Sequence, residues 1–385
     1  MTEALAPSPI VIVGHPFAPI GMGQHLRSAF RALRAAELPV EILDVYGIPN
    51  TDADLRAEFT PFLTDRVGSG VGIFCINGDE VDPILRHLGE RAGHGGAGHG
   101  GRIIYPMWEL PRYPSEWARE LERFDEVWAA SAYTQASFAS SVSIPVRRLP
   151  LATQPTFTQP LGRRSFGIPE DCYAFLLFCD LQSYIERKNP YAAIEAFRRV
   201  LEERPGLNTR LVIKINGSQT RPEQARKFTD RLESFADRVV VLDRTMTDAE
   251  IKALHVCCDA FVSLHRCEGY GFGMAEAMYF GKPTLATGYS GNVDFMLPGV
   301  AHRLDFKLIP VPEGAYPHAA GQVWADADVE QAAGVMIELA ENPEAGRALG
   351  AAASRHMRTH FSYRATGLRY ADALAKREPI PPEEE

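Results

Sequence analysis

Short apolar runs alternate with longer stretches of helical periodicity along the whole chain. Residues 9–14, Pro-Ile-Val-Ile-Val-Gly, form an apolar run that ends in glycine, which is typical of a buried parallel strand. Leu26, Phe30 and Leu33 follow at helical spacing. Strands that alternate with helices predict right-handed crossovers and a parallel sheet covered on both faces. Further strand candidates in this first series are residues 40–45, 71–76, 102–105, 126–129 and 146–149.

The same pattern starts again after residues 151–164, a loop rich in Pro, Thr and Gln. We therefore predict an α/β chain of two Rossmann-like, doubly wound parallel-sheet domains, at residues 1–153 and 154–360. A last helix at 361–377 and a disordered tail at 378–385 are expected to follow. Strand candidates of the second series are residues 174–179, 211–215, 239–242, 260–264, 284–287 and 303–306, with helical patterns at 190–202, 222–235 and 248–255.

The composition is that of a globular protein, and it argues against some classes of partner. The chain has 385 residues, 45% of them hydrophobic and 23% charged, with a formal net charge of −9. An acidic balance argues against nucleic acid as the main partner, because phosphate binding requires a basic footprint. The six cysteines form no C-x-x-C pair and no zinc-like spacing, so we expect reduced thiols. No apolar run approaches the about 18 residues of a membrane-spanning helix, and no secretory signal is evident. A cytoplasmic protein is the expectation.

One glycine-rich segment, residues 93–101, contains two histidines, His94 and His99. These imidazoles could bind a metal. Glycines, however, hold neither ring in place, and no carboxylate is interleaved. A surface insertion is therefore the preferred interpretation of this segment.

The densest set of chemical groups lies at residues 265–283, directly after the strand candidate 260–264. Ligands bind at the carboxyl ends of strands in open α/β sheets. Gly271 and Gly273 let the backbone approach a ligand closely. We expect a short helix at about residues 274–280, whose free N–H groups favour an anion such as phosphate.

Glu268 and Glu276 are the two acids of this segment. They could be the paired carboxylates of a glycoside hydrolase, but eight residues of helix would separate them by about 12 Å. Such hydrolases need roughly 5–9.5 Å. Carboxylates at a glycine-rich turn are better suited to accept hydrogen bonds from ribose or sugar hydroxyls. Either acid alone could also be a favourable charge at a helix N-terminus.

Glu268 and Glu276, with seven residues between them, resemble the E-x7-E signature of retaining nucleotide-sugar glycosyltransferases of the GT-B fold, glycosyltransferase family 4 (group 1). The resemblance continues through residues 281–292, Gly-Lys-Pro-Thr-Leu-Ala-Thr-Gly-Tyr-Ser-Gly-Asn, and through residues 124–131, Phe-Asp-Glu-Val-Trp-Ala-Ala-Ser. It implies two Rossmann-like domains that face a central cleft. The nucleotide would be held chiefly by the second domain.

The resemblance also implies roles for individual residues. Glu276 would hold the ribose hydroxyls, and Glu268 would contact hydroxyls of the donor sugar. The backbone of Gly271, Phe272 and Gly273 would donate N–H groups to the sugar or diphosphate. Base selectivity is expected around residues 216–219 and 244–248, with Asn216 as a nucleotide-binding candidate.

Arg187 and Lys188 follow another strand of the second domain and match the two cations with which the family grips the diphosphate. Many members carry Gly-Arg at the strand end, where this chain has Cys179-Asp180, so Arg187 would replace the usual arginine. The alternative is a solvated Arg-Lys pair before a helix. A cation here stabilises charge that develops on the leaving diphosphate and can replace a metal. We therefore predict neither a metal nor another cofactor.

In the first domain, residues 14–25 resemble the family's N-terminal glycine loop, which places Gly21 and Gly23 near the diphosphate. His15 is a candidate for acceptor or sugar binding, and His25 is a further cleft candidate; either could equally be a helix-capping or surface histidine. A dinucleotide-binding G-x-G-x-x-G is the rival interpretation, but residue 26 is leucine. Near the family's usual histidine this chain has Trp108 and Glu109. They could bind the sugar or acceptor, and Trp108 could equally pack in the core.

The predicted helix 26–38 carries Arg27, Arg31 and Arg34. They could lie against anionic lipid on the cytoplasmic face of the inner membrane, or they could form a solvated helix face. Residues 301–327, which include Tyr316 and Trp324, suggest no role.

The sequence thus predicts a retaining glycosyltransferase that moves a sugar from a UDP- or GDP-sugar to a hydroxyl of a glycan or lipid-linked acceptor. Cell-surface polysaccharide or glycoconjugate synthesis is the expected setting. The alternatives are a GT-B-fold epimerase or phosphorylase, or a non-catalytic nucleotide-sugar sensor. The base, the sugar, the acceptor and the oligomeric state are not predicted.

Overall fold

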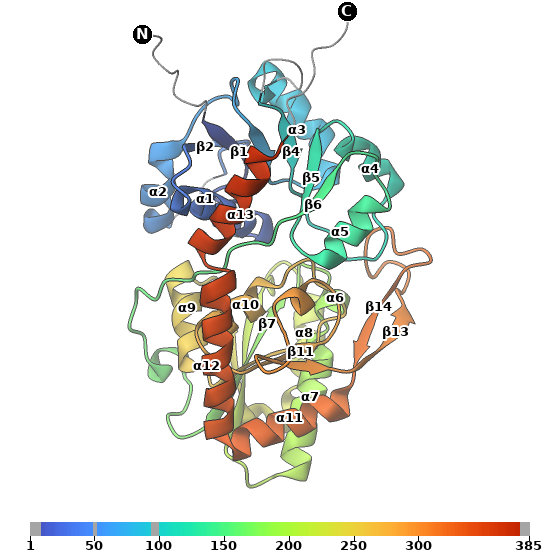
Figure 1. Ribbon diagram of the computed structural model, residues 1–385. Helices are drawn as coiled ribbons and strands as arrows, with labels where there is room; N and C mark the ends of the chain where they lie inside the picture. The colour runs from blue at the N-terminus through green and yellow to red at the C-terminus, as the bar shows by residue number, and fades with distance from the viewer. Residues whose placement is uncertain (1–8, 49–51, 94–99, 378–385) are drawn as a thin grey trace, which may run out of the picture. The chain divides into compact units, whose positions relative to one another are not determined.

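The computed structural model describes residues 9–48, 52–93 and 100–377 (Figure 1). His94, His99 and the tail 378–385 lie outside the described residues. The chain divides into two compact units. The N-terminal unit consists of the residues up to Ala152 together with the segment from His360 onward, and the C-terminal unit is Thr153–Thr359. The sequence placed this boundary one residue later.

A six-stranded sheet forms the centre of the N-terminal unit, with the strand order β2-β1-β3-β4-β5-β6. All neighbouring strands in it are parallel. The strands are β1 (Ile10–Gly14), β2 (Val40–Asp44), β3 (Gly72–Phe74), β4 (Arg102–Ile104), β5 (Glu126–Ala129) and β6 (Val146–Arg148). The helices that cover its two faces are α1 (Gly21–Ala35), α2 (Ala53–Phe59), α3 (Val81–Leu88), α4 (Ser115–Leu121), α5 (Ala132–Ala139) and α13 (Tyr363–Ala375).

The last helix, α13, packs on α1 of the N-terminal unit. Gly367 makes this approach possible, because a Cβ atom at that position would lie 1.9 Å from the carbonyl oxygen of Ala32. The hydroxyl of Tyr370 donates a hydrogen bond to the carbonyl of Pro150 (3.0 Å) and lies 3.3 Å from the hydroxyl of Tyr105. Close helix packing and buried hydrogen bonds therefore attach the end of the chain to this unit.

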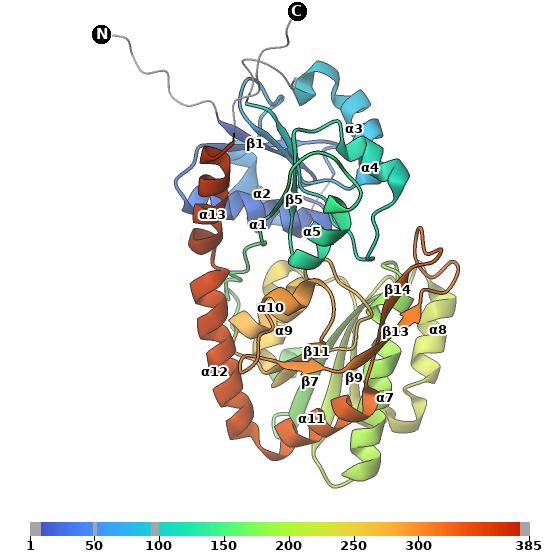
Figure 2. The same cartoon turned by 45° about the vertical axis from the view of Figure 1, so that its right-hand side comes forward.

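A second six-stranded parallel sheet forms the centre of the C-terminal unit, with the order β12-β11-β10-β7-β8-β9. Its strands are β7 (Tyr173–Asp180), β8 (Thr209–Asn216), β9 (Val239–Asp243), β10 (Ala260–Ser263), β11 (Thr284–Thr287) and β12 (His302–Leu304). The helices are α6 (Ile185–Lys188), α7 (Pro190–Glu203), α8 (Pro222–Asp230), α9 (Asp248–Cys257), α10 (Phe272–Tyr279), α11 (Val329–Glu341) and α12 (Pro343–His360). A separate antiparallel hairpin joins β13 (Phe306–Pro310) to β14 (Val323–Ala327), and its connecting loop projects beyond the two strands (Figure 2).

Two parallel sheets wound with helices confirm the predicted fold class. Every strand candidate of both series corresponds to an observed strand. The hairpin β13–β14 was not predicted. In each sheet, the loops that carry the motifs follow the carboxyl ends of the strands. Open α/β sheets bind ligands at this edge.

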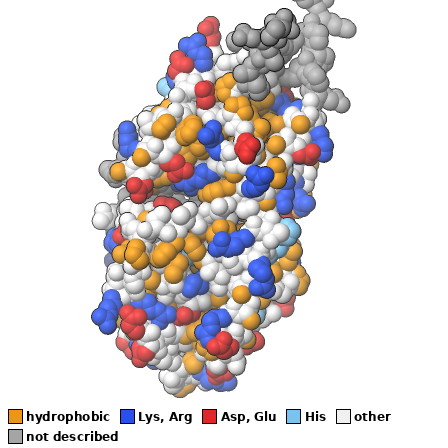
Figure 3. Space-filling model, turned by 60° about the vertical axis from the view of Figure 1, so that its left-hand side comes forward, with side chains coloured by type: hydrophobic (Ala, Val, Ile, Leu, Met, Phe, Trp, Pro, Cys, Tyr) orange, Lys and Arg blue, Asp and Glu red, His pale blue; other side chains and the backbone are white. Residues whose placement is uncertain are grey.

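The three arginines of α1 contact other residues of their own unit. Arg31 forms a bidentate ion pair with Glu58 through contacts of 2.6 and 2.7 Å. Arg34 lies over the ring of Phe62, and Arg27 donates to the carbonyl of Pro16 (2.8 Å). On the face in Figure 3, basic side chains are interspersed with acidic ones. In the described part of the chain, no helix combines the length and apolar character needed to cross a membrane. Peripheral membrane association stays a prediction.

Candidate functional site

The C-terminal unit brings the two predicted charged motifs together. Glu268 lies in the loop after β10, and Arg187 and Lys188 lie on the short helix α6 after β7. Strands β10 and β7 are parallel neighbours in the sheet. Because parallel strands end at the same edge, the two loops meet although they are 80 residues apart in sequence.

Both cations contact the carboxylate of Glu268. Arg187 Nη1 lies 3.2 Å from its Oε2 atom, and Lys188 Nζ donates to its Oε1 atom. The Glu268 side chain is 10% exposed and that of Arg187 is 5% exposed. Burial alone would raise the pKa of Glu268, but Lys188 and Arg187 outweigh it and lower that pKa to about 2. The carboxylate is therefore ionised at neutral pH, and the three charges form one cluster in which Arg187 and Glu268 are largely buried and Lys188 is 29% exposed.

The backbone around α6 fixes the direction of the two cations. Tyr184 and Asn189 flank the helix in the left-handed region, with φ values of 50° and 46°. Residues with a Cβ atom are strained in this backbone conformation. They keep it only where the surrounding structure enforces it. Asn189 Nδ2 donates to the carbonyl of Leu264 (3.0 Å), at the end of β10. Arg187 also donates to the carbonyl of Cys267 (3.1 Å), so α6 is tied to the loop that carries Glu268.

Glu276, the second acid, lies on α10 and is held by α9. Lys252 Nζ donates to its Oε1 atom, and His255 Nε2 lies 3.5 Å from its Oε2 atom. Lys252 also lies 3.2 Å from Asp248. The side chains of Lys252, His255 and Glu276 are 4%, 1% and 7% exposed. Helix α9 begins with a capping box at Thr247. This cap fixes the first turn of the helix that carries Lys252 and His255.

The charges of this second cluster are also settled by burial and pairing. Burial would raise the pKa of Glu276, but Lys252 and His255 outweigh it and lower that pKa to about 2. Burial would lower the pKa of Lys252, but Glu276 and Asp248 raise this pKa by more than burial lowers it. Burial lowers the pKa of His255, more than Glu276 raises it. The ion pair is therefore carried by Lys252, beside a neutral imidazole.

These two environments decide against a glycoside hydrolase pair. The general acid of such an enzyme needs a raised pKa to be protonated at neutral pH. The pKa values of Glu268 and Glu276 are both lowered to about 2. Each carboxylate is held by its own cation from a different helix. Two carboxylates that are ionised at neutral pH are suited to accept hydrogen bonds from hydroxyl groups.

Helix α10 begins at Phe272, two residues earlier than the sequence suggested. Gly271 is its N-cap with φ of 101°, a conformation that favours glycine. A Cβ atom at Gly273 would lie 3.0 Å from the Phe261 ring and 3.2 Å from the Phe178 ring, so a larger residue would disturb both. The N–H groups of Phe272 and Gly273 have no acceptor within the helix. The predicted backbone donors thus lie at a helix N-terminus.

His265 organises the loop between β10 and Glu268, a contribution that the sequence analysis missed. Its side chain is buried, with Nε2 lying 3.0 Å from Asn292 Oδ1 and Nδ1 lying 3.1 Å from Ser263 Oγ. Burial lowers the pKa of this histidine. Thr287 Oγ1 donates to the His265 carbonyl (2.6 Å), and the loop is thereby joined to the end of β11.

Asn216 ends β8 beside a buried lysine. Lys214 Nζ donates to Asn216 Oδ1, so this oxygen already has a partner in the protein. Burial lowers the pKa of Lys214. Ser218 Oγ donates to Asp243 Oδ1 (2.7 Å), which joins the carboxyl ends of β8 and β9. The two loops that the sequence proposed for the base therefore meet at one edge of the sheet.

In the N-terminal unit, the glycine loop forms the start of α1. Gly21 has open space around the position of a Cβ atom, whereas a Cβ at Gly23 would lie 2.2 Å from the Ala18 carbonyl oxygen. His15 Nε2 lies 3.2 Å from Glu80 Oε1, and its ring stacks on the half-exposed ring of Tyr46 at 5.5 Å. The three side chains come from the carboxyl ends of β1, β2 and β3. They form a polar and aromatic cluster at that edge of the sheet.

His25 is wrong as a cleft candidate. It is fully buried in α1, its ring lies 4.2 Å from that of Tyr105, and burial lowers its pKa to about 3. Trp108 likewise proves to be a core residue. It is 2% exposed, its Nε1 donates to the carbonyl of Arg112 (2.9 Å), and its ring packs against Trp117. Glu109 remains half-buried beside it.

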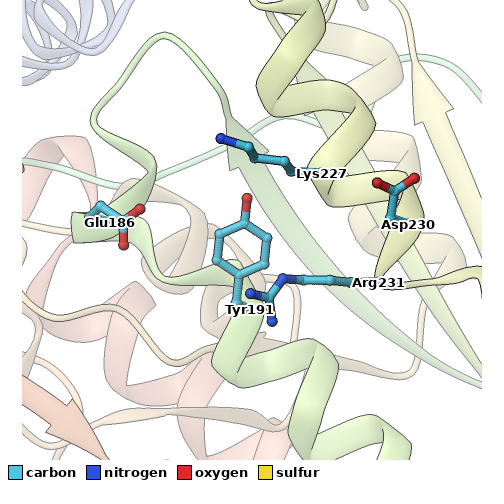
Figure 4. Close-up of a pocket in the computed structure, with 5 residues that line it drawn as sticks. All are labelled: Glu186, Tyr191, Lys227, Asp230 and Arg231. Atoms are coloured by element: carbon cyan, nitrogen blue, oxygen red, sulfur yellow. The ribbon is translucent and has the colours of Figure 1, made fainter.

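A surface pocket of about 440 Å³ lies beside α6 on the C-terminal unit, with Glu186 of that helix in its lining. The Arg231 guanidinium lies over the Tyr191 ring at 4.5 Å, in the middle of the pocket lining (Figure 4). None of the site residues predicted from the sequence lines this pocket. Its lining residues, of mixed charge, are Glu186, Tyr191, Lys227, Asp230 and Arg231. Within the described ranges, no group of three or more His, Cys, Asp or Glu side chains could hold a metal ion.

Two parallel sheets, each wound with helices and carrying charged loops at the strand ends, define a GT-B-type protein. Solved structures share this fold. Anabaena HepE in complex with UDP-glucose matches with a TM-score of 0.69 at 12% identity, over 96% of this chain and 100% of that chain. Sucrose-phosphate synthase from Thermosynechococcus elongatus matches with a TM-score of 0.68 at 14% identity, over 96% and 98%.

S. aureus TarM, solved in a complex that contains UDP, matches with a TM-score of 0.57 at 11% identity. The match covers 81% of this chain but only 56% of TarM. No curated protein matches the sequence significantly. Residues 175–356 match the family described as glycosyl transferases group 1, and this range contains both charged clusters. The C-terminal unit therefore contains a region that is similar to group 1 glycosyl transferases.

Proposed function

We propose that this protein is a retaining glycosyltransferase that moves a sugar from a UDP- or GDP-sugar to a hydroxyl of a glycan or lipid-linked acceptor. The observation that carries the proposal is the cluster of Arg187, Lys188 and Glu268 at the carboxyl ends of β7 and β10. Such an edge is the ligand-binding position of an open α/β sheet. Synthesis of a cell-surface polysaccharide or glycoconjugate is the proposed setting.

The nucleotide is proposed to bind through Glu276. Its ionised carboxylate accepts hydrogen bonds from the two ribose hydroxyls, and Lys252 keeps it ionised and oriented. The N–H groups of Phe272 and Gly273 at the start of α10 would face the diphosphate or the sugar. The complexes of HepE with UDP-glucose and of TarM with UDP support a uridine or related nucleotide as donor.

Arg187 and Lys188 are proposed to hold the leaving diphosphate. In the transfer, the bond between the sugar C1 and the diphosphate oxygen breaks, and its electron pair stays on that oxygen. The acceptor oxygen attacks C1 from the same face and gives its proton to a diphosphate oxygen. Two fixed cations stabilise the charge that develops on the diphosphate, a large contribution in reactions of this kind. They supply this charge without a metal ion.

Glu268 is proposed to change partners during the reaction. Without donor it accepts from both cations. When a diphosphate binds, its oxygens take over these contacts, and the carboxylate accepts hydrogen bonds from hydroxyls of the donor sugar. In the second state the cations pair with the diphosphate, and the sugar hydroxyls supply hydrogen bonds to the Glu268 carboxylate, because a buried charge without partners is costly.

Consumption of sugar nucleotides tests this function. The full chain is incubated with UDP-glucose, UDP-N-acetylglucosamine or GDP-mannose, with and without glycan acceptors, and release of nucleoside diphosphate is measured with and without EDTA. We expect release from one donor, accelerated by an acceptor and insensitive to EDTA. Conversion of the donor without an acceptor indicates an epimerase, dependence on orthophosphate indicates a phosphorylase, and binding without consumption indicates a sensor.

A further inference from the structure

The loop between β13 and β14, residues 311–322, places an aromatic ring over Arg187 (the hairpin is seen in Figure 2). Tyr316 of this loop is 9% exposed, and its ring lies 4.8 Å from the ring of Tyr184. The Arg187 Cζ atom lies 5.9 Å from the centroid of the Tyr316 ring. A guanidinium at this distance is attracted by the negative face of the ring. A segment that suggested no role in the sequence therefore contacts a cation of the site.

The base of the same hairpin is attached to the helix that carries Arg187. Arg266 lies over the buried ring of Trp324 at 5.4 Å and contacts Asp326 of β14 at 3.3 Å. The backbone N–H of Arg266 donates to the carbonyl of Arg187 (2.8 Å), and its Nη1 donates to the carbonyl of Glu186 (2.7 Å). One residue thus binds both the hairpin and α6. The position of the hairpin is coupled to the position of the cation.

Hydrogen bonds within the loop order the segment that carries Tyr316. The N–H of Val311 donates to the carbonyl of Gln322 (2.9 Å), and the N–H of Gln322 donates to that of Ala319 (2.9 Å). The buried side chain of Gln322 donates through Nε2 to the carbonyl of His318 (3.2 Å). The ring is therefore presented by an ordered loop.

We propose that Tyr316 is a positioning residue for Arg187: its ring holds the guanidinium toward the diphosphate and shields it from water. The inference rests on the function proposed above. Glu268, the Cys267 carbonyl and Ser183 accept hydrogen bonds at the edge of the guanidinium. The Tyr316 ring covers its face. Because a charge interacts more strongly where water is excluded, the ring increases the stabilisation of the leaving group in the transition state.

The proposal depends on the aromatic face and not on the hydroxyl group. We expect Tyr316→Phe to keep kcat and KM within about twofold of the wild type. Tyr316→Ala and Tyr316→Leu lose the ring, and we expect kcat to fall about tenfold with KM changed less than about twofold. Tyr316→Leu keeps apolar bulk in the loop, so it reports on the ring if Tyr316→Ala fails to fold. Leu308→Ala, at a 54% exposed position of the same hairpin, is the matched control.

The test uses the full chain and two measurements. The first is kcat and KM for release of nucleoside diphosphate from UDP-glucose or GDP-mannose. The second is the Kd of inorganic pyrophosphate by calorimetry, which we expect to rise about fivefold in Tyr316→Leu and to stay unchanged in Tyr316→Phe and Leu308→Ala. Equal losses in Tyr316→Phe and Tyr316→Leu, a change of KM alone, or equal losses in Leu308→Ala overturn the inference.

The two measurements separate this inference from the proposed function. If the wild type consumes no sugar nucleotide, the proposed function fails, while pyrophosphate binding still tests the hold of Tyr316 on Arg187. A wild type that binds no pyrophosphate, or a Tyr316→Leu variant that binds it as tightly as the wild type, overturns the inference alone. Turnover that is unaffected by Tyr316→Leu has the same consequence.

Discussion

The carboxylate of Glu268 lies 3.2 Å from the guanidinium of Arg187, in a buried contact between two loops 81 residues apart in sequence. Lys188 donates to the other carboxylate oxygen. Without substrate, the Glu268 carboxylate therefore pairs with the two cations that we propose bind the diphosphate. The charges are oriented before the donor binds, and such preorganisation avoids the cost of reorienting them during the reaction.

Replacing Lys188 tests its role in stabilising the leaving group. Lys188→Met removes a positive charge from the diphosphate site, and we expect kcat to fall about 10²–10³-fold, as when one group that stabilises developing charge is removed elsewhere. Steady-state release of nucleoside diphosphate measures this. Lys227→Met, which removes a lysine from the surface pocket, is the matched control. Equal activity of Lys188→Met and wild type would remove Lys188 from the mechanism.

Lys252 is expected to maintain the ribose site. Lys252→Met leaves Glu276 as a buried carboxylate without its ion pair, which costs about 3–5 kcal/mol in comparable cases. We expect lower stability and at least about tenfold weaker binding of UDP or GDP. The double variant Lys252→Met/Glu276→Gln removes both charges and should recover stability but not nucleotide binding. Denaturation and calorimetry measure the two effects, and a stable single variant with unchanged affinity would contradict this role.

The lowered pKa of Glu276 predicts acid sensitivity. Its pKa is lowered from 4.5 to about 2 in the folded protein, so the stability that it contributes is complete above about pH 4.5 and is lost as the pH falls toward 2. In Glu276→Gln, the slope of unfolding free energy against pH in this window should be smaller by up to about 1.4 kcal/mol per pH unit. Urea denaturation at several pH values gives the slope. Identical slopes for wild type and variant would show that this carboxyl is not perturbed.

Gly367 should be essential for the packing of α13 on α1. A Cβ atom there would lie 1.9 Å from the carbonyl oxygen of Ala32, and overpacking of this kind costs about 1–3 kcal/mol. We expect Gly367→Ala to lower the melting temperature. Gly334→Ala is the matched control, because this exposed glycine of α11 has open space around its Cβ position. The control should be neutral or stabilise by up to about 1 kcal/mol. The same response to both substitutions would contradict the packing argument.

The sequence predicted the strands well because buried parallel strands are short apolar runs that differ clearly from their surroundings. The start of α10 was predicted two residues too late, since Gly271, Phe272 and Gly273 resemble a loop by composition. In the structure, the positive φ of Gly271 is the cap that allows the helix to begin at Phe272. The hairpin β13–β14 was missed because its two strands form a separate two-stranded sheet and carry exposed residues such as Leu308.

The candidate site was predictable where it is local in sequence. The spacing of Glu268 and Glu276 and the pair Arg187-Lys188 are visible in the chain, but their mutual contacts depend on the order of β7 and β10 in the sheet. Lys252 could have been noticed as a charged residue among the apolar residues of a helix. Its pairing with Glu276, and the contact of Tyr316 with Arg187, could be identified only from the three-dimensional structure.

Nucleotide binding by Glu276 is the most direct test of the central claim, which is that this edge of the sheet binds a nucleoside diphosphate. Melting temperatures are measured for wild type, Glu276→Ala and the surface control Lys227→Met, each with and without excess UDP or GDP. A ligand at about 100 times its Kd stabilises by about 2.7 kcal/mol. We predict that one nucleotide raises the melting temperature of the wild type and of the control by several degrees, and that Glu276→Ala loses this shift. Absence of a shift in the wild type with either nucleotide, or the same shift in Glu276→Ala, would contradict the claim.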